Sequence, residues 1–250
     1  MRKINALPIG YSDVERVIRT GYYVDKTRYA QELIEKENPV FIARPRRFGK
    51  SLFINTLATI CRGEQEVFKD YYIGKPENGY QWKKYPVIKL DLSQLTNDTP
   101  DLLELSLEDL LTRIASSYKL TLTGQVLKTK FSSLIEDMTK LGSYYESKIV
   151  VLIDEYDAPI VNLTKGSDLE KANIKVMKDF FMTLKSLNEY FEFTFITGVS
   201  KFSLSDVFSG ANHLDDITYI QKCRCHVWIY PRRDIACFLR KHTCYWFRME

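Results

Sequence analysis

The sequence predicts an open parallel α/β sheet flanked by helices, and three observations predict it. Short apolar segments alternate with longer amphipathic segments along most of the 250 residues. This alternation is typical of βαβ units, whose strands lie parallel in one sheet. Gly49-Lys50-Ser51 follows the first clear apolar strand segment, and Asp154-Glu155 follows a later one. Open parallel sheets carry their ligand chemistry at the carboxyl ends of the strands, which is where these polar clusters fall.

Composition and charge favour a folded core without indicating a polyanionic partner. Hydrophobic residues make up 45% of the chain and charged residues 27%, as is ordinary for globular domains. The formal net charge of +4 comes from 36 basic and 32 acidic residues, too small an excess to indicate nucleic-acid binding by itself. The sequence shows neither a membrane-spanning apolar run nor a signal peptide, so we expect a cytoplasmic location and no membrane association.

The first strand, turn and helix are expected within residues 39–60. Residues 39–43 form a short apolar run that predicts a strand. An arginine-rich turn follows at residues 44–49, and residues 51–60 are predicted to be helical. This order of strand, loop and helix is the context in which phosphate-binding loops occur.

Three further strands and three helices are expected downstream. The strands are predicted at residues 87–92, 149–153 and 191–197. The run at 149–153 is entirely apolar and rich in β-branched residues, which is typical of a strand in the middle of a parallel sheet. Apolar stripes at helical spacing mark the helices: Leu103, Leu107, Leu110, Ile114 and Tyr118; Leu127, Phe131, Leu134, Met138 and Leu141; and Ile174, Met177, Phe181, Leu184 and Leu187.

The turn at residues 44–51 has the pattern of a phosphate-binding loop. It matches G-x-x-x-x-G-K-[ST] at every position except the first, where Arg44 replaces glycine. Lys50 would reach the β- and γ-phosphates, and the Ser51 hydroxyl would bind Mg²⁺. We predict that the loop binds a nucleotide, preferably ATP, through these residues: Arg46, Arg47, Phe48, Gly49, Lys50, Ser51 and Leu52.

Two considerations oppose this interpretation of the loop. The first is that a basic turn can precede a helix and contain the Gly-Lys-Ser tripeptide by chance. The second is that the Cβ atom of Arg44 restricts the opening turn of the loop.

Two adjacent carboxylates end the apolar strand at residues 149–153. Asp154 would hold Mg²⁺, directly or through water, and Glu155 would orient and deprotonate the attacking water. The alternative is that these carboxylates cap the next helix. Together with the loop, the pair predicts a P-loop NTPase-type open parallel sheet with a catalytic-glutamate arrangement. In such ATPases a strand is inserted between the two motif strands, and the strand at 87–92 is interpreted in this way.

The strand at residues 191–197 ends where a sensor of the γ-phosphate would lie. Thr197 or Ser200 would hydrogen-bond the γ-phosphate or the attacking water. Ordinary turn chemistry at the end of a strand explains these two residues equally well.

Five blocks occur in order along the chain: LPIG at 7–10, YYVDKT at 22–27, RPRRFGKS at 44–51, LIDEYD at 152–157, and TGVSK at 197–201 with FSG at 208–210. With these blocks the chain resembles the AAA-ATPase-like family of prokaryotic P-loop proteins, whose members often carry a C-terminal PD-(D/E)XK-nuclease-like domain. The resemblance implies that Arg44 is usual in the family. It also implies that Tyr23, Asp25 and Lys26 lie near the nucleotide, although these residues equally fit a strand edge and a helix cap.

The chain is expected to have three parts: a segment at residues 1–38 before the P-loop strand, an ATPase core at 39–219 and an atypical tail at 220–250. The tail departs from the family pattern. One interpretation is a zinc site, although the spacing fits poorly, made from Cys223, Cys225, His226, Cys237, His242 and Cys244. The other is a truncated member whose tail is translated out of frame, because codons compatible with residues 221–234 spell a helix-forming stretch after one base is dropped.

The sequence favours a Mg²⁺-dependent ATPase that couples hydrolysis to conformational change in a partner protein or in a missing C-terminal module. The main alternative is a non-hydrolysing, nucleotide-gated module that binds protein or DNA. Direct nucleic-acid binding through Arg44, Arg46, Arg47 and the tail arginines is a third and weaker interpretation. Loop arginines are explained more simply as phosphate-facing or solvated side chains.

Overall fold

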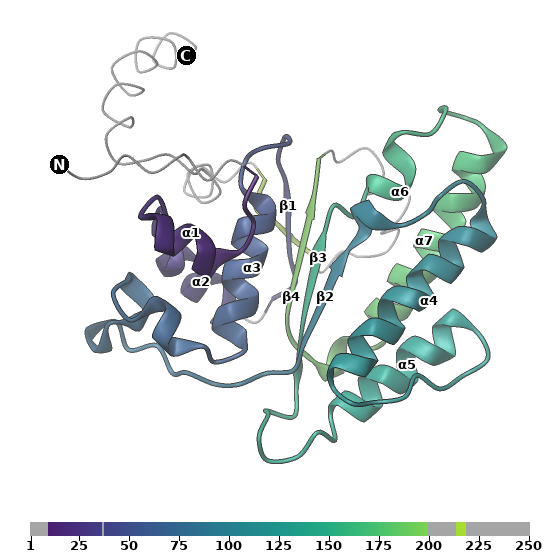
Figure 1. Cartoon of the computed structure of the whole chain (residues 1–250). Helices are drawn as coiled ribbons and strands as arrows, with labels where there is room; N and C mark the ends of the chain where they lie inside the picture. Colours follow the sequence, from purple (N-terminus) through teal and green to yellow (C-terminus); the bar gives the residue numbers. More distant parts are fainter. Residues whose placement is uncertain (1–9, 37, 200–213, 219–250) are drawn as a thin grey trace, which may run out of the picture.

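The computed structural model describes residues 10–36, 38–199 and 214–218 of the chain. Its centre is a five-stranded sheet with helices on either side (Figure 1). The strands are β1 (Val40–Ala43), β2 (Val87–Asp91), β3 (Ile149–Asp154), β4 (Phe191–Gly198) and β5 (Asp215–Asp216). All neighbouring strands pair in parallel. The predicted open parallel sheet is therefore confirmed.

The strand order is β2-β3-β4-β1-β5, so β4 lies between the two motif strands β1 and β3. Among the strands that the structure describes, β2 is at the edge of the sheet and pairs with β3. The prediction that the strand at residues 87–92 is inserted between the two motif strands is therefore wrong. Order along the chain does not fix order in the sheet, because a helical crossover carries the chain past its neighbours before it returns.

Helices cover both faces of the sheet (Figure 1). The helices α1 (Val14–Thr20), α2 (Thr27–Ile34) and α3 (Lys50–Cys61) lie on one face, and α4 (Pro100–Ser117), α5 (Leu127–Met138) and α7 (Asp168–Ser186) lie on the other. The short helix α6 (Ala158–Val161) follows β3. There are also 3-10 turns: η1 (Gln65–Phe68), η2 (Tyr72–Gly74), η3 (Pro76–Asn78), η4 (Leu92–Gln94) and η5 (Asn188–Tyr190). Within the residues that the structure describes, no helix has the length and hydropathy needed to cross a membrane.

The short strand β1 supplies side chains to both apolar layers. Phe41 and Ala43 belong to the cluster beneath α4, α5 and α7, whereas Val40 and Ile42 belong to the cluster beneath α3. Successive side chains of a strand point to opposite faces, so a strand covered on both sides needs apolar residues at every position. All residues of β1 are buried, and so are all residues of β3. This double coverage explains why the motif strands are continuous apolar runs in the sequence.

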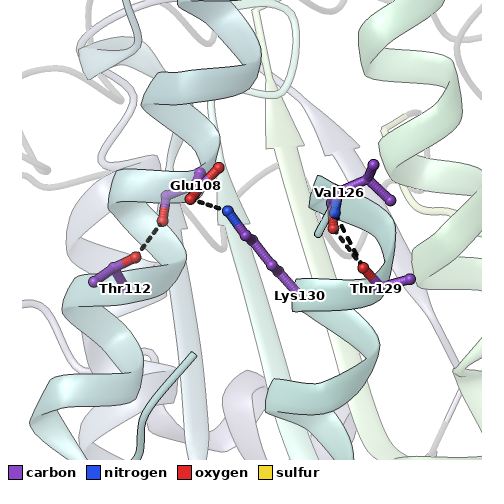
Figure 2. A network of polar contacts seen from close by, with 5 residues as sticks. All are labelled: Glu108, Thr112, Val126, Thr129 and Lys130. Carbon is purple, nitrogen blue, oxygen red and sulfur yellow. Dashed lines mark hydrogen bonds and ion pairs between the residues drawn. The ribbon is translucent and has the colours of Figure 1, made fainter. Parts of the chain in front are cut away.

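A polar network joins α4 to α5 in the outer helix layer (Figure 2). Lys130 of α5 forms an ion pair with Glu108 of α4, and these side chains are 17% and 33% exposed. Local hydrogen bonds cap the start of α5. The Val126 N–H donates to Thr129 Oγ1 at 3.2 Å, and the Thr129 hydroxyl donates to the Val126 carbonyl at 2.9 Å. A partly exposed ion pair contributes about 1 kcal/mol or less. The apolar residues beneath these helices are therefore the main source of their stability.

Candidate functional site

The carboxyl ends of the central strands bring the predicted polar residues to one edge of the sheet. Lys50 begins α3 a few residues after β1, Asp154 ends β3, and Thr197 lies one residue before the end of β4. The strand ends are joined directly, since the Arg44 N–H donates to the Gly198 carbonyl at 3.0 Å. Residues from three sequence motifs are thus gathered at one end of the sheet.

The loop between β1 and α3 contains two residues with left-handed backbone conformation. Gly49 has a φ of +74° and caps α3, and Arg47 has a φ of +68°. Glycine adopts this conformation without steric cost, whereas a residue with a Cβ atom is strained by about 1 kcal/mol. Arg44 does not have a positive φ. The backbone therefore does not require glycine at position 44, and the restriction expected from the Arg44 Cβ atom is not found.

Lys50 is buried at the base of this loop. Its side chain is largely covered, with the residue 5% exposed, and its Nζ donates to the carbonyls of Arg44 at 3.1 Å and Pro45 at 3.3 Å. Burial lowers the pKa of the Lys50 ammonium, and the nearby charges of Glu155 and Asp154 act in the opposite direction. The lysine from the first motif therefore lies within electrostatic reach of both carboxylates from the second motif.

Thr197 of β4 forms hydrogen bonds with both Asp154 and Glu155. Its hydroxyl donates to Asp154 Oδ1 at 2.5 Å and accepts from the Glu155 N–H at 3.4 Å. Asp154 is 4% exposed and Thr197 is fully buried. Thr197 thus orients Asp154 and the turn that follows β3. Its predicted contact with a γ-phosphate or with water stays a prediction.

Glu155 follows β3 in a left-handed backbone conformation, with a φ of +52°. A non-glycine residue with positive φ is uncommon, and such strain occurs often at functional sites. Burial is the largest cause that raises the pKa of the Glu155 carboxyl, the charge of Lys50 lowers it, and the charges of Asp154 and Asp91 raise it. A carboxylate with a raised pKa is a better proton acceptor near neutral pH.

The sequence did not identify Asp91 as a candidate site residue, although the sheet places it beside Asp154. The two residues are paired in the register of β2 and β3, so their side chains leave the same face of the sheet. Asp91 accepts hydrogen bonds from the Ser93 N–H at 3.1 Å and the Ser93 hydroxyl at 2.6 Å. Two residues earlier, Lys89 Nζ donates to Asn55 Oδ1 of α3 at 2.5 Å. The available signal was a carboxylate at the end of an apolar strand, the same pattern that identified Asp154.

Tyr23 of the N-terminal motif lies against the middle of α3, whereas Asp25 contacts the start of α2 and η2. The Tyr23 hydroxyl is 3.2 Å from Thr56 Oγ1. Asp25 accepts from the Thr27 N–H at 2.9 Å, the Thr27 hydroxyl at 2.6 Å and the Tyr72 N–H at 2.8 Å. Asp25 therefore ties the start of α2 to η2, which supports the helix-cap alternative. Proximity of this motif to a nucleotide stays a prediction.

Some predicted residues lie outside the described parts of the chain. These are residues 7–9 of the first block, Ser200 and Lys201, the FSG block at 208–210, and the tail at 220–250 with its candidate zinc ligands.

Tyr156 and Asp157 pack the end of β3 against the end of β4. Both carboxylate oxygens of Asp157 are 3.1 Å from the Val199 nitrogen and accept its N–H. The Tyr156 ring is fully buried, and a Cβ atom on Gly198 would lie 2.3 Å from its Cε1 atom. The close contact requires glycine at position 198.

Replacing Gly198 by alanine is therefore expected to lower the free energy of unfolding by about 2–3 kcal/mol, because the buried ring has little room to move away from the added methyl group. Chemical denaturation measures this change. Gly142→Ala is the matched control, since Gly142 has a φ of +91° but a Cβ atom added there would meet no heavy atom within 4 Å. Its cost is expected to be about 1 kcal/mol from backbone strain alone. Equal destabilisation by the two substitutions would contradict the packing explanation.

Comparisons with known proteins match the part of the chain that contains this site. A family model described as "Predicted AAA-ATPase" matches residues 8–208. A protein of Azotobacter chroococcum mcd 1, described as an uncharacterized protein in the vnfD 5′ region, is 34% identical to this chain over 217 residues. That alignment covers 85% of this chain and 40% of the relative, so the chain spans less than half of the relative's length.

Proposed function

Because the chain belongs to the Predicted AAA-ATPase family, we propose that it binds ATP together with Mg²⁺ at the loop that precedes α3. The main support is the convergence of Lys50, Asp154 and Glu155, whose charges interact although two separate motifs supply them. A buried cation beside carboxylates at the start of a helix suits a ligand that brings both phosphates and a metal ion.

The loop and the first turn of α3 would bind the phosphates. Gly49, in a left-handed conformation, caps the start of the 12-residue helix α3, whose first N–H groups and dipole favour an anion. Lys50 would add the charge of its ammonium group. The proposed nucleotide contacts are Arg46, Arg47, Phe48, Gly49, Lys50, Ser51 and Leu52. Leu52 would act through its backbone, because its side chain packs in the core.

Ser51 and Asp154 would hold the Mg²⁺ ion. Hydroxyl and carboxylate oxygens are the hard donors that magnesium prefers, and nucleotide sites complete its coordination with phosphate oxygens and water. Asp154 is 4% exposed, and Thr197 fixes one of its carboxylate oxygens. The donor set therefore fits this ion. When bound with ATP, Mg²⁺ supplies charge neutralisation at the phosphates.

Glu155 would orient the attacking water and accept its proton. The hydrogen bond from its N–H to Thr197 helps fix the turn that carries the carboxylate. Thr197 and Ser200 are proposed to act at the γ-phosphate end of the site. Hydrolysis would drive conformational change in a partner protein or a C-terminal module, within a chain divided at about residues 38 and 219. The greater length of the relative is in keeping with such a module.

Replacing Asp154 by asparagine tests the metal assignment. Calorimetric titration with ATP is expected to show that affinity in Mg²⁺ falls about tenfold or more, because one hard anionic ligand is lost. Affinity in EDTA should change much less. Asp109→Asn, which removes an exposed carboxylate from α4, is the control and should keep the full Mg²⁺ dependence. The same Mg²⁺ dependence in both variants would remove Asp154 from the metal site.

A further inference from the structure

Arg44 occupies the position of the first P-loop glycine, and its side chain contacts the far edge of the sheet. Its Nη1 donates to the carbonyl of Thr218, just beyond β5, and to its neighbour Ala43's carbonyl at 3.1 Å. Since the backbone does not need glycine here, the side chain itself offers the physical reason for arginine. It joins the beginning of the loop to a residue 174 positions later in the chain.

The short strand β5 depends on a few contacts with β1. The Asp215 N–H donates to the Pro39 carbonyl at 2.8 Å, and the Ile217 N–H donates to the Phe41 carbonyl at 3.0 Å. Beyond the strand, Thr218 Oγ1 accepts from the Ala43 N–H at 3.0 Å. A pairing of two residues has few hydrogen bonds to lose, so its opening is sensitive to each neighbouring contact.

The backbone of Arg44 contacts both the end of β4 and Lys50 of the candidate site. Its N–H donates to the Gly198 carbonyl at 3.0 Å, and its carbonyl accepts from Lys50 Nζ at 3.1 Å. Arg44 therefore touches the proposed phosphate-binding lysine, the end of β4 and Thr218, which lies two residues beyond β5. Two of its hydrogen bonds link Lys50 to Thr218.

We propose that Arg44 is a positioning residue that couples the phosphate loop to β5. Its side chain, anchored on Thr218, fixes the carbonyl that holds Lys50. A nucleotide that orders the loop then strengthens the anchor on Thr218, and by linkage the anchor strengthens nucleotide binding. This inference rests on the proposed nucleotide binding at Lys50. Its consequence is that a nucleotide bound at the loop stabilises Thr218, from which the chain continues towards its C-terminus.

Hydrogen exchange on the full chain tests the coupling. The measured amides are Asp215 and Ile217, with and without Mg²⁺ and a non-hydrolysable ATP analogue. In the unsubstituted protein the analogue is expected to slow exchange of these two amides about tenfold. The reason is that the charge-assisted hydrogen bond from Arg44 to Thr218 becomes stronger. In Arg44→Gly, exchange without ligand should be about tenfold faster, and saturating analogue should slow it less than about twofold.

Two matched variants separate coupling from general loop damage. Arg44→Lys keeps a cationic donor toward Thr218 and should restore most of the ligand-dependent protection. Pro45→Gly loosens the same loop but keeps the Arg44 side chain and its hydrogen bond to Thr218, so protection of Asp215 and Ile217 by saturating analogue should persist. A purely structural role for Arg44 would change exchange equally in the free and bound states.

Equal ligand-dependent protection in the unsubstituted protein and Arg44→Gly would overturn the coupling while leaving nucleotide binding intact. Absence of any binding to the unsubstituted protein, measured by calorimetry, would overturn the proposed function as well, so the two failures are distinguishable. If Arg44→Gly does not fold, Arg44→Met provides the same test, because it keeps a long unbranched side chain but lacks the donor that bonds to the Thr218 carbonyl. Reduced ligand-dependent protection of the Ile217 amide in that variant supports the coupling, and unchanged ligand-dependent protection overturns it.

Discussion

Replacing Lys50 by alanine is expected to weaken ATP binding by about a hundredfold or more, equivalent to about 2.7 kcal/mol of binding free energy. The ammonium group is nearly buried, so its attraction to phosphate charges is screened less than that of a surface lysine. Its hydrogen-bond partners are the neutral carbonyls of Arg44 and Pro45, and the nearby carboxylates of Glu155 and Asp154 lose its compensating charge when the lysine is removed. Calorimetric titration with ATP and Mg²⁺ measures the loss.

Lys128→Ala is the control for the Lys50 experiment. Lys128 is an exposed lysine on α5, on the opposite face of the sheet, so its removal changes the net charge equally without touching the loop. Its effect on affinity should be less than about twofold. An affinity of Lys50→Ala within about threefold of the unsubstituted protein would place the nucleotide elsewhere.

Replacing Glu155 by glutamine is expected to preserve ATP affinity and to slow phosphate release about 10²- to 10³-fold. Glutamine has nearly the same shape and keeps the backbone N–H that bonds to Thr197. It does not accept a proton from water, which is the step that general-base catalysis contributes. Single-turnover phosphate release at saturating ATP separates this effect from binding. Glu136→Gln, an exposed substitution on α5, should leave the rate unchanged.

The pH dependence of hydrolysis gives a second readout for Glu155. A general base acts only when deprotonated, so activity is present above its pKa and is lost as pH falls through that pKa. Burial, the largest cause, raises the pKa of Glu155, so the acidic loss should begin at a higher pH than for an exposed glutamate. Unchanged hydrolysis in Glu155→Gln would contradict the assignment. Tight ATP binding with no phosphate release from the unsubstituted protein would instead favour the nucleotide-gated binding module.

The buried elements of the fold were predictable because their sequence patterns are strong. The strand expected at 149–153 is observed as β3, Ile149–Asp154, since a strand buried on both faces is a continuous apolar run. α1 was not predicted, because it has seven residues and buries only Val14 and Val17, too few for a periodic stripe. β5 is the acidic pair Asp215–Asp216, and its pairing with β1, rather than local propensity, makes it a strand.

The site was predictable where local pattern determines position. Asp154 and Glu155 follow a strand that must be buried, which places them at its carboxyl end. The sequence does not determine what lies beside them, since strand order depends on tertiary packing. The contact of Asp154 with Thr197, its pairing with Asp91 and the contact of Arg44 with Thr218 all depend on that order.

The most direct test of ATP binding at this loop is the shift in melting temperature caused by ATP with Mg²⁺ in the unsubstituted protein and in Lys50→Ala. A ligand that binds only the folded state adds about 2.7 kcal/mol of stability at a hundredfold excess over its Kd. For a domain of roughly 200 residues this corresponds to a rise of about 5–10 °C. Binding at the loop predicts that rise in the unsubstituted protein and a shift below about 2 °C in Lys50→Ala at the same ATP concentration. Equal shifts in the two proteins, or no shift in the unsubstituted protein at millimolar ATP, would contradict it.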